Sequence, residues 1–242
     1  MANESTKQVT FKIYRYDPEG NRPPYFQEFT IPYIRGTTVL DGLIYVQENL
    51  DSTLAFRRSC RMAICGTCAV LVNKYPHLAC HTQIEEFNSD KLTVEPLANL
   101  PVIKDLVTSL DPMFEKHRSI KPYIIRGDRK EMDNPTAEYL QKPEELDEFM
   151  QFTDCVGCGI CVAACPTSAS DKLFLGPQAI AQCYRYCKDT RDEGEKDRIS
   201  LVSNGHGVWQ CHLSGACSEA CPKGLDPALA IQLLKRRLVS RA

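Results

Sequence analysis

The sequence predicts an α+β protein with two domains, a β-rich domain at residues 1–105 and an all-α domain at residues 106–242. Three observations support this prediction. The length of 242 residues fits one or two domains. Alternation of apolar and polar residues, which is typical of strands, lies near the N-terminus, and helical spacing replaces it after about residue 101. Each half also carries its own group of cysteines.

The first domain is expected to begin with two strands and a helix. Residues 9–13 alternate between apolar and polar side chains, which predicts a half-buried strand, and residues 29–31 predict the strand that returns. Thr37 or Thr38 can cap the next helix, whose apolar side chains recur at helical spacing over residues 40–50.

A cysteine-containing loop and further strands complete this domain. The loop spans residues 57–68. We expect a hairpin formed by AVLVN and LACHT, with its turn at Tyr75-Pro76, and a last strand at residues 92–94. The order strand, strand, helix, loop, strand and strand is compatible with a β-grasp ferredoxin.

The second domain is expected to be helical. Residues 102–114 carry apolar side chains every four residues, which predicts a helix. The polar residues 127–148 indicate a connector, with an ordered surface excursion as the alternative. A helix is predicted at residues 177–189, and Asp226 followed by Pro227 is typical of the start of a final helix.

The first cysteine group has the C-x4-C-x2-C…C spacing of plant-type ferredoxins. Its members are Cys60, Cys65, Cys68 and Cys80. Thiolate is a soft ligand that suits iron–sulfur clusters, so these four residues predict one [2Fe–2S] site. Gly66 fits a loop whose backbone must come close to the cluster.

The second group forms the pattern C-x2-C-x2-C-x3-C-P of bacterial ferredoxins, in which three thiolates hold one cluster and the fourth serves another. This all-α domain is therefore predicted to be bacterial-ferredoxin-like. The pattern consists of Cys155, Cys158, Cys161 and Cys165.

A second copy of this pattern, CHLSGACSEACP, has Ser214 where the second cysteine would stand. Crossed sharing then predicts a [4Fe–4S] cluster on Cys155, Cys158, Cys161 and Cys221. It leaves three thiolates for a [3Fe–4S] cluster, those of Cys165, Cys211 and Cys217, with Ser214 beside the missing iron. A [4Fe–4S] cluster with Ser214 as its fourth ligand is the alternative.

Two cysteines stay outside these sets. Cys183 and Cys187 are four residues apart on a predicted helix. Because every site is already filled, we interpret them as small buried apolar residues, with a redox-sensing pair as the alternative.

Composition and charge favour a soluble protein of the cytoplasm. The 13 cysteines occur without an apolar signal segment, which argues against disulfides. No stretch approaches the roughly 20 apolar residues of a membrane span. The net charge of −2 gives no electrostatic reason to expect nucleic-acid binding. The basic end KRRLVSRA is interpreted as a solvated helix terminus.

The motifs RRSCRMAICGTCAVLVN with LAC, CVGCGICVAACP and CSEACPKGLDP occur in this order. They resemble the iron–sulfur subunit of succinate dehydrogenase and fumarate reductase (complex II), and the resemblance covers nearly the whole chain. The segment PTSAS after Cys165 lacks the tryptophan of succinate-dehydrogenase-type members, which favours fumarate-reductase-like members.

The resemblance implies an oxidoreductase subunit with no substrate site and no catalytic residue of its own. Its partners would be an FAD-containing flavoprotein subunit and membrane anchor subunits of the cytochrome b type, at the cytoplasmic face of the inner membrane. Electrons would pass between FAD, the [2Fe–2S], [4Fe–4S] and [3Fe–4S] clusters, and quinone or quinol. The chain would position the clusters and set their potentials.

Three other residues match positions on the quinone side of this family. His212 could hydrogen-bond quinone or a haem propionate, and Lys235 could contribute to the quinone site. Packing or solvation is the alternative for His212, and a plain surface lysine is the alternative for Lys235. Trp209 is interpreted rather as a core residue, since a single tryptophan usually buries a large apolar surface.

Three arginines flank the first cysteine loop, Arg57, Arg58 and Arg61. Docking to a partner or tuning of the cluster potential competes with simple solvation for each of them.

Two other functions remain as alternatives. Cysteine groups with x2 spacing also bind zinc, but the plant-type spacing and the Cys-Pro endings favour iron–sulfur clusters. An iron–sulfur subunit of another flavoenzyme, such as a thiol-linked fumarate reductase, would carry the same pair of ferredoxin patterns.

Overall fold

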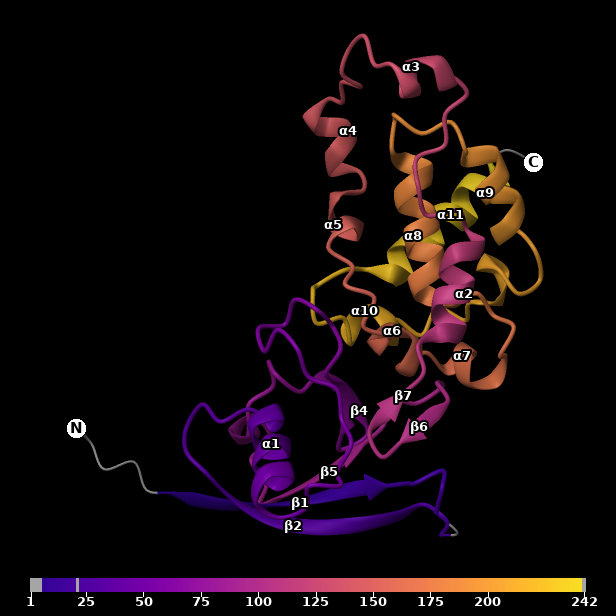
Figure 1. Cartoon of the computed structure of the whole chain (residues 1–242). Coiled ribbons are helices and arrows are strands. Elements are labelled where there is room, and N and C mark those ends of the chain that lie inside the picture. The colour runs from indigo at the N-terminus through magenta and orange to yellow at the C-terminus, as the bar shows by residue number, and fades with distance from the viewer. Residues whose placement is uncertain (1–5, 21, 241–242) are drawn as a thin grey trace. The chain divides into compact units, whose positions relative to one another are not determined.

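The computed structural model describes residues 6–20 and 22–240 and divides the chain into two compact units (Figure 1). The first unit comprises the described residues of Met1–Leu110 together with Val156–Ala164. The second unit comprises Asp111–Cys155 and the described residues of Cys165–Ala242. The mixed sheet and the helices confirm the predicted α+β class at this level.

The first unit contains a five-stranded mixed sheet (Figure 1). Its order is β2-β1-β5-β3-β4, with β1 parallel to β5 and the other neighbours antiparallel. The strands are β1 (Lys7–Arg15), β2 (Tyr25–Tyr33), β3 (Ala69–Val72), β4 (Tyr75–Leu78) and β5 (Lys91–Glu95). The strands predicted at residues 9–13, 29–31 and 92–94 are confirmed, because they lie within β1, β2 and β5. Alternate residues of β1 and β5 are buried, as the sequence pattern predicted.

Helix α1 (Val39–Asn49) belongs to the same unit, and the 3₁₀ helix η1 (Ile84–Phe87) follows β4. Thr38 caps α1 through a reciprocal pair of hydrogen bonds with Asp41, as the sequence predicted. A Cβ at Gly42 would lie 2.6 Å from the ring of Phe11, so the absence of a side chain lets α1 approach β1 closely.

The turn of the β3–β4 hairpin was predicted wrongly. It lies at Asn73 and Lys74, which have φ values of 49° and 74°, and not at Tyr75-Pro76. Asn73 tolerates this left-handed backbone, which suits the tight turns of hairpins. Pro76 lies inside β4, which is tolerated because β4 is an edge strand of the sheet.

The helix predicted from residue 102 was also wrong over its first half. Residues 102–108 form a small hairpin of β6 (Val102–Lys104) and β7 (Val107–Thr108), and α2 (Asp111–Ser119) begins only afterwards. Asp105 explains the difference, because it has a φ of 45° and its buried carboxylate accepts hydrogen bonds that a helix would not allow. The donors are the Arg15 guanidinium and the backbone N–H groups of Tyr16 and Ala55.

Helices are the only regular secondary structure among the described residues of the second unit. They are α2, α3 (Arg129–Asp133), α4 (Pro143–Asp147), α5 (Met150–Thr153), α7 (Pro166–Ser170), α8 (Gly176–Lys188), α9 (Glu195–Val202), η2 (Val208–Gln210), α10 (Ala216–Glu219) and α11 (Pro227–Val239). The predicted helix at residues 177–189 is confirmed as α8, and Asp226 caps α11 by accepting from the Leu229 N–H group. The predicted connector at residues 127–148 is mostly exposed but contains α3 and α4.

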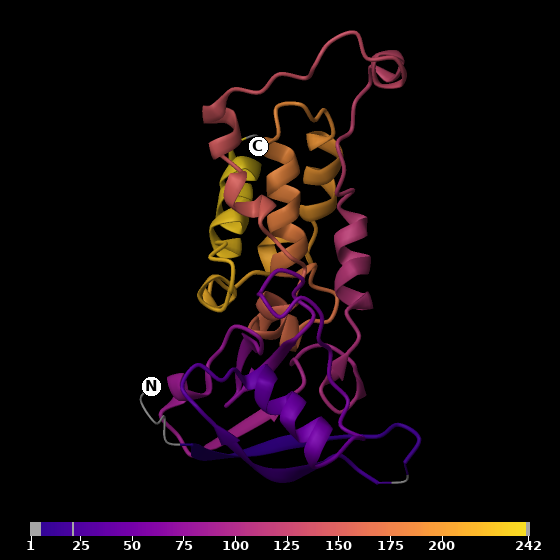
Figure 2. The ribbon, with the colours of Figure 1, turned by 60° about the vertical axis from the view of Figure 1, so that its left-hand side comes forward.

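Helix α8 is the centre of the second unit and packs against α2, α5, α9 and α11 (Figure 2). Apolar side chains from these helices and from their connections form one core. A fully buried ion pair between Arg198 and Asp192 adds to it, and the Arg198 guanidinium also donates to the carbonyl groups of Lys121 and Tyr123. Within the described residues, no helix combines the length and the apolar character that are needed to cross a membrane.

Candidate iron–sulfur sites

The loop of the first cysteine group aims backbone N–H groups at two of its sulfur atoms. Cys60 Sγ accepts at 3.3–3.4 Å from three residues, Met62, Ile64 and Cys65. Cys80 Sγ accepts from the Ala63 N–H group at 3.3 Å. Such hydrogen bonds stabilise a thiolate and raise the reduction potential of a cluster that the thiolate binds. The loop therefore suits negatively charged sulfur.

The backbone of this loop is left-handed at three residues, Arg61 (φ 57°), Ala63 (57°) and Gly66 (72°). The left-handed conformation is uncommon for arginine and alanine. Alternation of left- and right-handed residues forms a concave row of N–H groups, a geometry found at many iron–sulfur sites. The loop therefore fits the [2Fe–2S] cluster that its spacing predicts.

The remaining two thiols of this group lie in different environments. A hydrogen bond between Cys65 and the Thr67 hydroxyl lowers the pKa of Cys65 to about 6. Burial raises the pKa of Cys68 to about 12, and a thiol hydrogen bond with Cys80 adds to this shift. The interaction with Cys80 joins two of the four predicted ligands, which lie on either side of the β3–β4 hairpin.

The two copies of the bacterial pattern have the same local fold. In both, a left-handed glycine, Gly159 (φ 82°) or Gly215 (75°), precedes a helix of four residues, which is α6 (Ile160–Ala163) in one copy and α10 in the other. The residue two positions after the first cysteine is also left-handed in both, Gly157 in one copy and Leu213 in the other. The second copy therefore keeps this loop conformation although Ser214 replaces a cysteine.

The three cysteines predicted for the [3Fe–4S] cluster all belong to the second unit. Burial raises the pKa of Cys217 to about 11, and the nearby Cys165 and Cys211 add to this shift. Cys165 also caps α7, since its sulfur accepts from the Ser168 N–H group at 3.4 Å. Ser214 is exposed. Three buried or half-buried thiols beside an exposed serine fit a cluster with three cysteine ligands.

The predicted [4Fe–4S] ligands are divided between the units. Cys158 and Cys161 belong to the first unit, and Cys155 and Cys221 to the second. The Gln178 side-chain amide lies 3.9 Å from Cys155 Sγ and 3.2 Å from His117 Nδ1. Sequence reasoning missed Gln178, because no spacing rule links it to a cysteine 23 residues earlier.

Within residues 6–20 and 22–240, no three His, Cys, Asp or Glu side chains form a group that could hold a metal ion. The ligand sets therefore rest on the spacing and on the conformation of the loops. They remain predictions.

Comparison with known proteins decides the family. Residues 10–115 match the model of a 2Fe-2S iron-sulfur cluster binding domain, and residues 151–225 match that of a 4Fe-4S dicluster domain. The chain is 44% identical to the fumarate reductase iron-sulfur subunit of Mycobacterium tuberculosis, with 97% of this chain and 94% of the relative covered. It is 36% identical to the succinate dehydrogenase iron-sulfur subunit of Paracoccus denitrificans, with 98% and 90% covered.

The chain belongs to the family of fumarate reductase and succinate dehydrogenase iron–sulfur subunits. It is accordingly an electron-transfer subunit of a complex II-type enzyme and carries [2Fe–2S], [4Fe–4S] and [3Fe–4S] clusters. A solved chain of the Mycobacterium smegmatis Sdh1 complex in the apo form has a TM-score of 0.88 at 26% identity, with 98% of each chain covered.

Three residues of this iron–sulfur subunit were predicted on the quinone side, and all three lie near Cys211 in the sequence or in space. Lys235 on α11 donates a hydrogen bond to the Cys211 carbonyl group at 3.0 Å. Trp209 is 47% exposed, so its interpretation as a core residue was wrong. His212 is exposed as well. The short helix η2 ends directly before Cys211 and leaves the Trp209 ring outside the core.

The three arginines of the first cysteine loop, Arg57, Arg58 and Arg61, are exposed. Arg58 lies 3.9 Å from Glu48, a weak surface pair. The predicted burial is confirmed for Cys183, whose side chain lies fully in the core around α8, whereas Cys187 is only half-buried and packs against that core. Their sulfur atoms are 3.9 Å apart.

Proposed function

We propose that three cysteine sets hold the three clusters of this subunit. Cys60, Cys65, Cys68 and Cys80 bind the [2Fe–2S] cluster. Cys155, Cys158, Cys161 and Cys221 bind the [4Fe–4S] cluster. Cys165, Cys211 and Cys217 bind the [3Fe–4S] cluster. The observation that carries this assignment is the shared loop conformation of the two bacterial patterns, with N–H groups of the first cysteine loop aimed at sulfur.

The fold follows the same division. The mixed sheet with α1 supports a β-grasp domain of the plant-type ferredoxin kind, which we propose spans residues 1–105. The helices around α8 support an all-α domain of the bacterial-ferredoxin kind at residues 106–242. Residues 106–110 and 156–164 pack with the first unit, so the compact units and the sequence domains differ in these two segments.

The subunit conducts electrons between two partners. One is a flavoprotein subunit that holds FAD, and the other is a membrane anchor of the cytochrome b type at the cytoplasmic face of the inner membrane, where quinone or quinol binds. The relatives with 36–44% identity are named as subunits of fumarate reductase or succinate dehydrogenase, which supports this assembly. When bound, the clusters accept and release single electrons.

The protein contributes the surroundings of the clusters. Backbone N–H groups around Cys60 and Cys80 stabilise negative sulfur. On the quinone side, Lys235 places a cationic group beside the Cys211 carbonyl, while His212 and Trp209 offer a ring nitrogen and an apolar ring at the surface. These three side chains suit contact with a quinone head group.

Low-temperature EPR of the purified complex tests this function. A sharp, nearly isotropic signal in the air-oxidised sample and a [2Fe–2S] spectrum after dithionite reduction are expected. Absence of the oxidised signal would overturn the three-thiolate assignment, and a colourless protein with bound zinc would overturn the iron–sulfur function. Recovery of a flavoprotein and an anchor with the subunit tests the partners, whereas recovery of a different flavoenzyme would overturn them.

A further inference from the structure

Gly66, directly after the cluster ligand Cys65, lies against the loop that carries Cys158. A Cβ at Gly66 would lie 2.8 Å from the Cys158 Cβ and 3.1 Å from both the Cys158 Cα and the Val156 carbonyl oxygen. Real Cβ contacts are essentially never as short as the first of these distances. Any other residue at position 66 would therefore push the two loops apart, in addition to being strained at a φ of +72°.

Asn99 forms hydrogen bonds with the C-terminal end of the segment that carries Cys158 and Cys161. Its side-chain amide donates hydrogen bonds to the carbonyl groups of Val162 (2.9 Å) and Ala163 (3.1 Å), at the C-terminal end of α6. Asn99 has a φ of 65°, a conformation that asparagine tolerates better than most residues. The Asn99 side chain thus ties residues 1–110 of the first unit to the C-terminal end of α6, where helix carbonyl groups lack the full set of internal donors.

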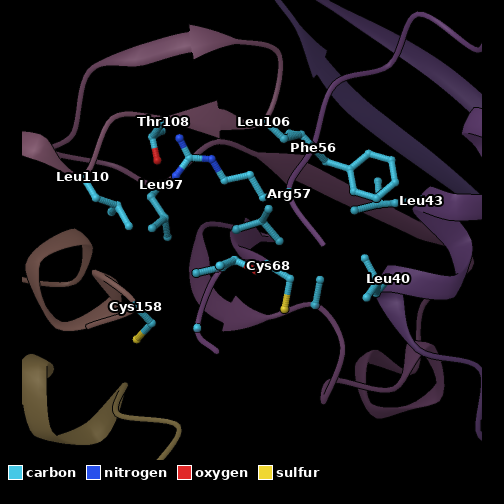
Figure 3. Close-up of a pocket in the computed structure, with 15 residues that line it drawn as sticks. Leu40, Leu43, Phe56, Arg57, Cys68, Leu97, Leu106, Thr108, Leu110 and Cys158 are labelled. Carbon is cyan, nitrogen blue, oxygen red and sulfur yellow. The ribbon is translucent and has the colours of Figure 1, made fainter. Parts of the chain in front are cut away.

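Apolar contacts complete the attachment. A Cβ at Gly159 would lie 3.0 Å from the Leu110 side chain and 3.3 Å from that of Leu100, so the backbone of this loop rests directly on the leucines. Cys158 is among the residues that line one pocket together with Cys68, Leu97 and Arg57 (Figure 3). The cavity has a volume of about 10 Å³, room for about one water molecule. The loops therefore have little space in which to shift toward each other.

We propose that Gly66 and Asn99 are positioning residues that hold the Cys158–Cys161 loop against the [2Fe–2S] loop. In this way they set the separation over which one electron passes between the first and the second cluster, a step in which no bond forms or breaks. This inference rests on the ligand sets proposed above. Neither side chain needs to touch iron, because both act on the backbone that carries the cysteines.

Two pairs of variants distinguish a loss of loop positioning from a general loss of stability. Gly66→Ala is compared with Gly36→Ala, because Gly36 has a similar φ of +83° but nothing within 4 Å of its would-be Cβ. Asn99→Asp is compared with Asn73→Asp. Asn73 is also left-handed (φ 49°), but its side-chain oxygen accepts from the Thr93 N–H group, a bond that aspartate keeps. Asn99→Asp loses a donor to two carbonyl groups.

The readout is the magnetic interaction between the reduced [2Fe–2S] and [4Fe–4S] clusters in the purified complex, measured by microwave power saturation of the [2Fe–2S] signal. We expect Gly66→Ala and Asn99→Asp to saturate at several-fold lower power than wild type, since a larger separation weakens relaxation. Electron transfer from succinate to quinone should fall several-fold. Gly36→Ala and Asn73→Asp should match wild type in both measurements.

Iron content and signal intensity are measured in parallel. If Gly66→Ala fails to assemble its clusters, Asn99→Asp decides the question, because it changes one side-chain group without adding bulk. Wild-type saturation in a fully loaded Asn99→Asp protein would overturn the positioning role and leave the ligand sets intact. Absence of one cluster signal from the wild-type complex would instead overturn the ligand sets themselves.

Discussion

Leu213 has the same backbone φ as Gly157, 62° in each case, and the two residues occupy the same position in the two copies of the bacterial cysteine pattern. Glycine adopts this conformation freely, but leucine does so at a cost. A strained residue persists only where the surrounding structure determines its conformation. The second copy thus keeps a backbone suited to a cluster although its second cysteine is a serine.

Replacement of Leu213 by glycine should relieve this strain. A left-handed non-glycine residue costs about 1–3 kcal/mol, and the extra entropy of unfolded glycine offsets about 0.5–1 kcal/mol of the gain. Because the Leu213 side chain is 53% exposed, little apolar burial is lost. We expect Leu213→Gly to raise the free energy of unfolding by about 1 kcal/mol, as measured by urea denaturation. Leu173→Gly, at an exposed leucine without a positive φ, should lower it; a similar loss in Leu213→Gly would contradict the strain.

Replacement of Ser214 by cysteine should complete the second pattern. The added thiolate would stand at the position that Cys158 occupies in the first copy, so a fourth iron can be held there. We expect the oxidised three-iron EPR signal to disappear and the potential of this cluster to fall. Ser214→Ala removes the hydroxyl without adding a ligand and should keep the three-iron signal. Persistence of that signal in Ser214→Cys would show that Ser214 does not lie beside the missing iron.

Gln178 should raise the reduction potential of the cluster that Cys155 binds, because its amide N–H lies near the Cys155 sulfur. Gln178→Leu is expected to lower that potential in a redox titration followed by EPR. Gln182 offers a matched control one turn further along α8, where its amide donates to the Phe152 carbonyl group and not to a cysteine sulfur. Gln182→Leu should reduce stability by about 1–3 kcal/mol and leave the potential unchanged. Equal potentials in the two variants would rule out a role for the Gln178 amide.

His77 should make stability depend on pH. Burial lowers the pKa of His77 below its usual value of 6.5, although Glu86 opposes part of the shift. The unfolded chain therefore binds this proton more tightly than the folded chain, so stability is complete above pH 6.5 and falls as the pH drops toward the folded pKa. The melting temperature of wild type should decrease on acidification over this range. His77→Gln should show a shallower decrease, with a remaining slope from His117, whose pKa burial also lowers. Identical slopes would contradict this account.

Local chemistry explains what could be predicted from the sequence. Thr38 and Asp226 were found as helix caps because a cap depends on residues three positions away. The three cysteine sets were likewise predicted from residues that are close together in the sequence, through their spacing. Helix α8 was predicted to within one residue at each end.

Long-range contacts explain the errors. Residues 102–108 have helical spacing, but Asp105 bonds to groups 50 and 89–90 residues away, and these bonds impose a hairpin. Trp209 was misplaced because its burial depends on the whole second unit. Gln178 and Asn99 carry no motif, and only the tertiary structure brings them to Cys155 and α6.

The assignment of residues 156–164 to the first unit has a consequence for biosynthesis. Translation proceeds from the N-terminus, and domains tend to fold as units as they leave the ribosome. This unit cannot be completed when Leu110 emerges, because the partners of Gly66 and Asn99 are encoded after a further stretch of second-unit chain. The strands of the sheet all precede residue 96, so the sheet can form early, but the unit is complete only once residues 156–164 have been made. Metal loading of the first cysteine loop therefore either precedes the completion of its own unit or is delayed with it.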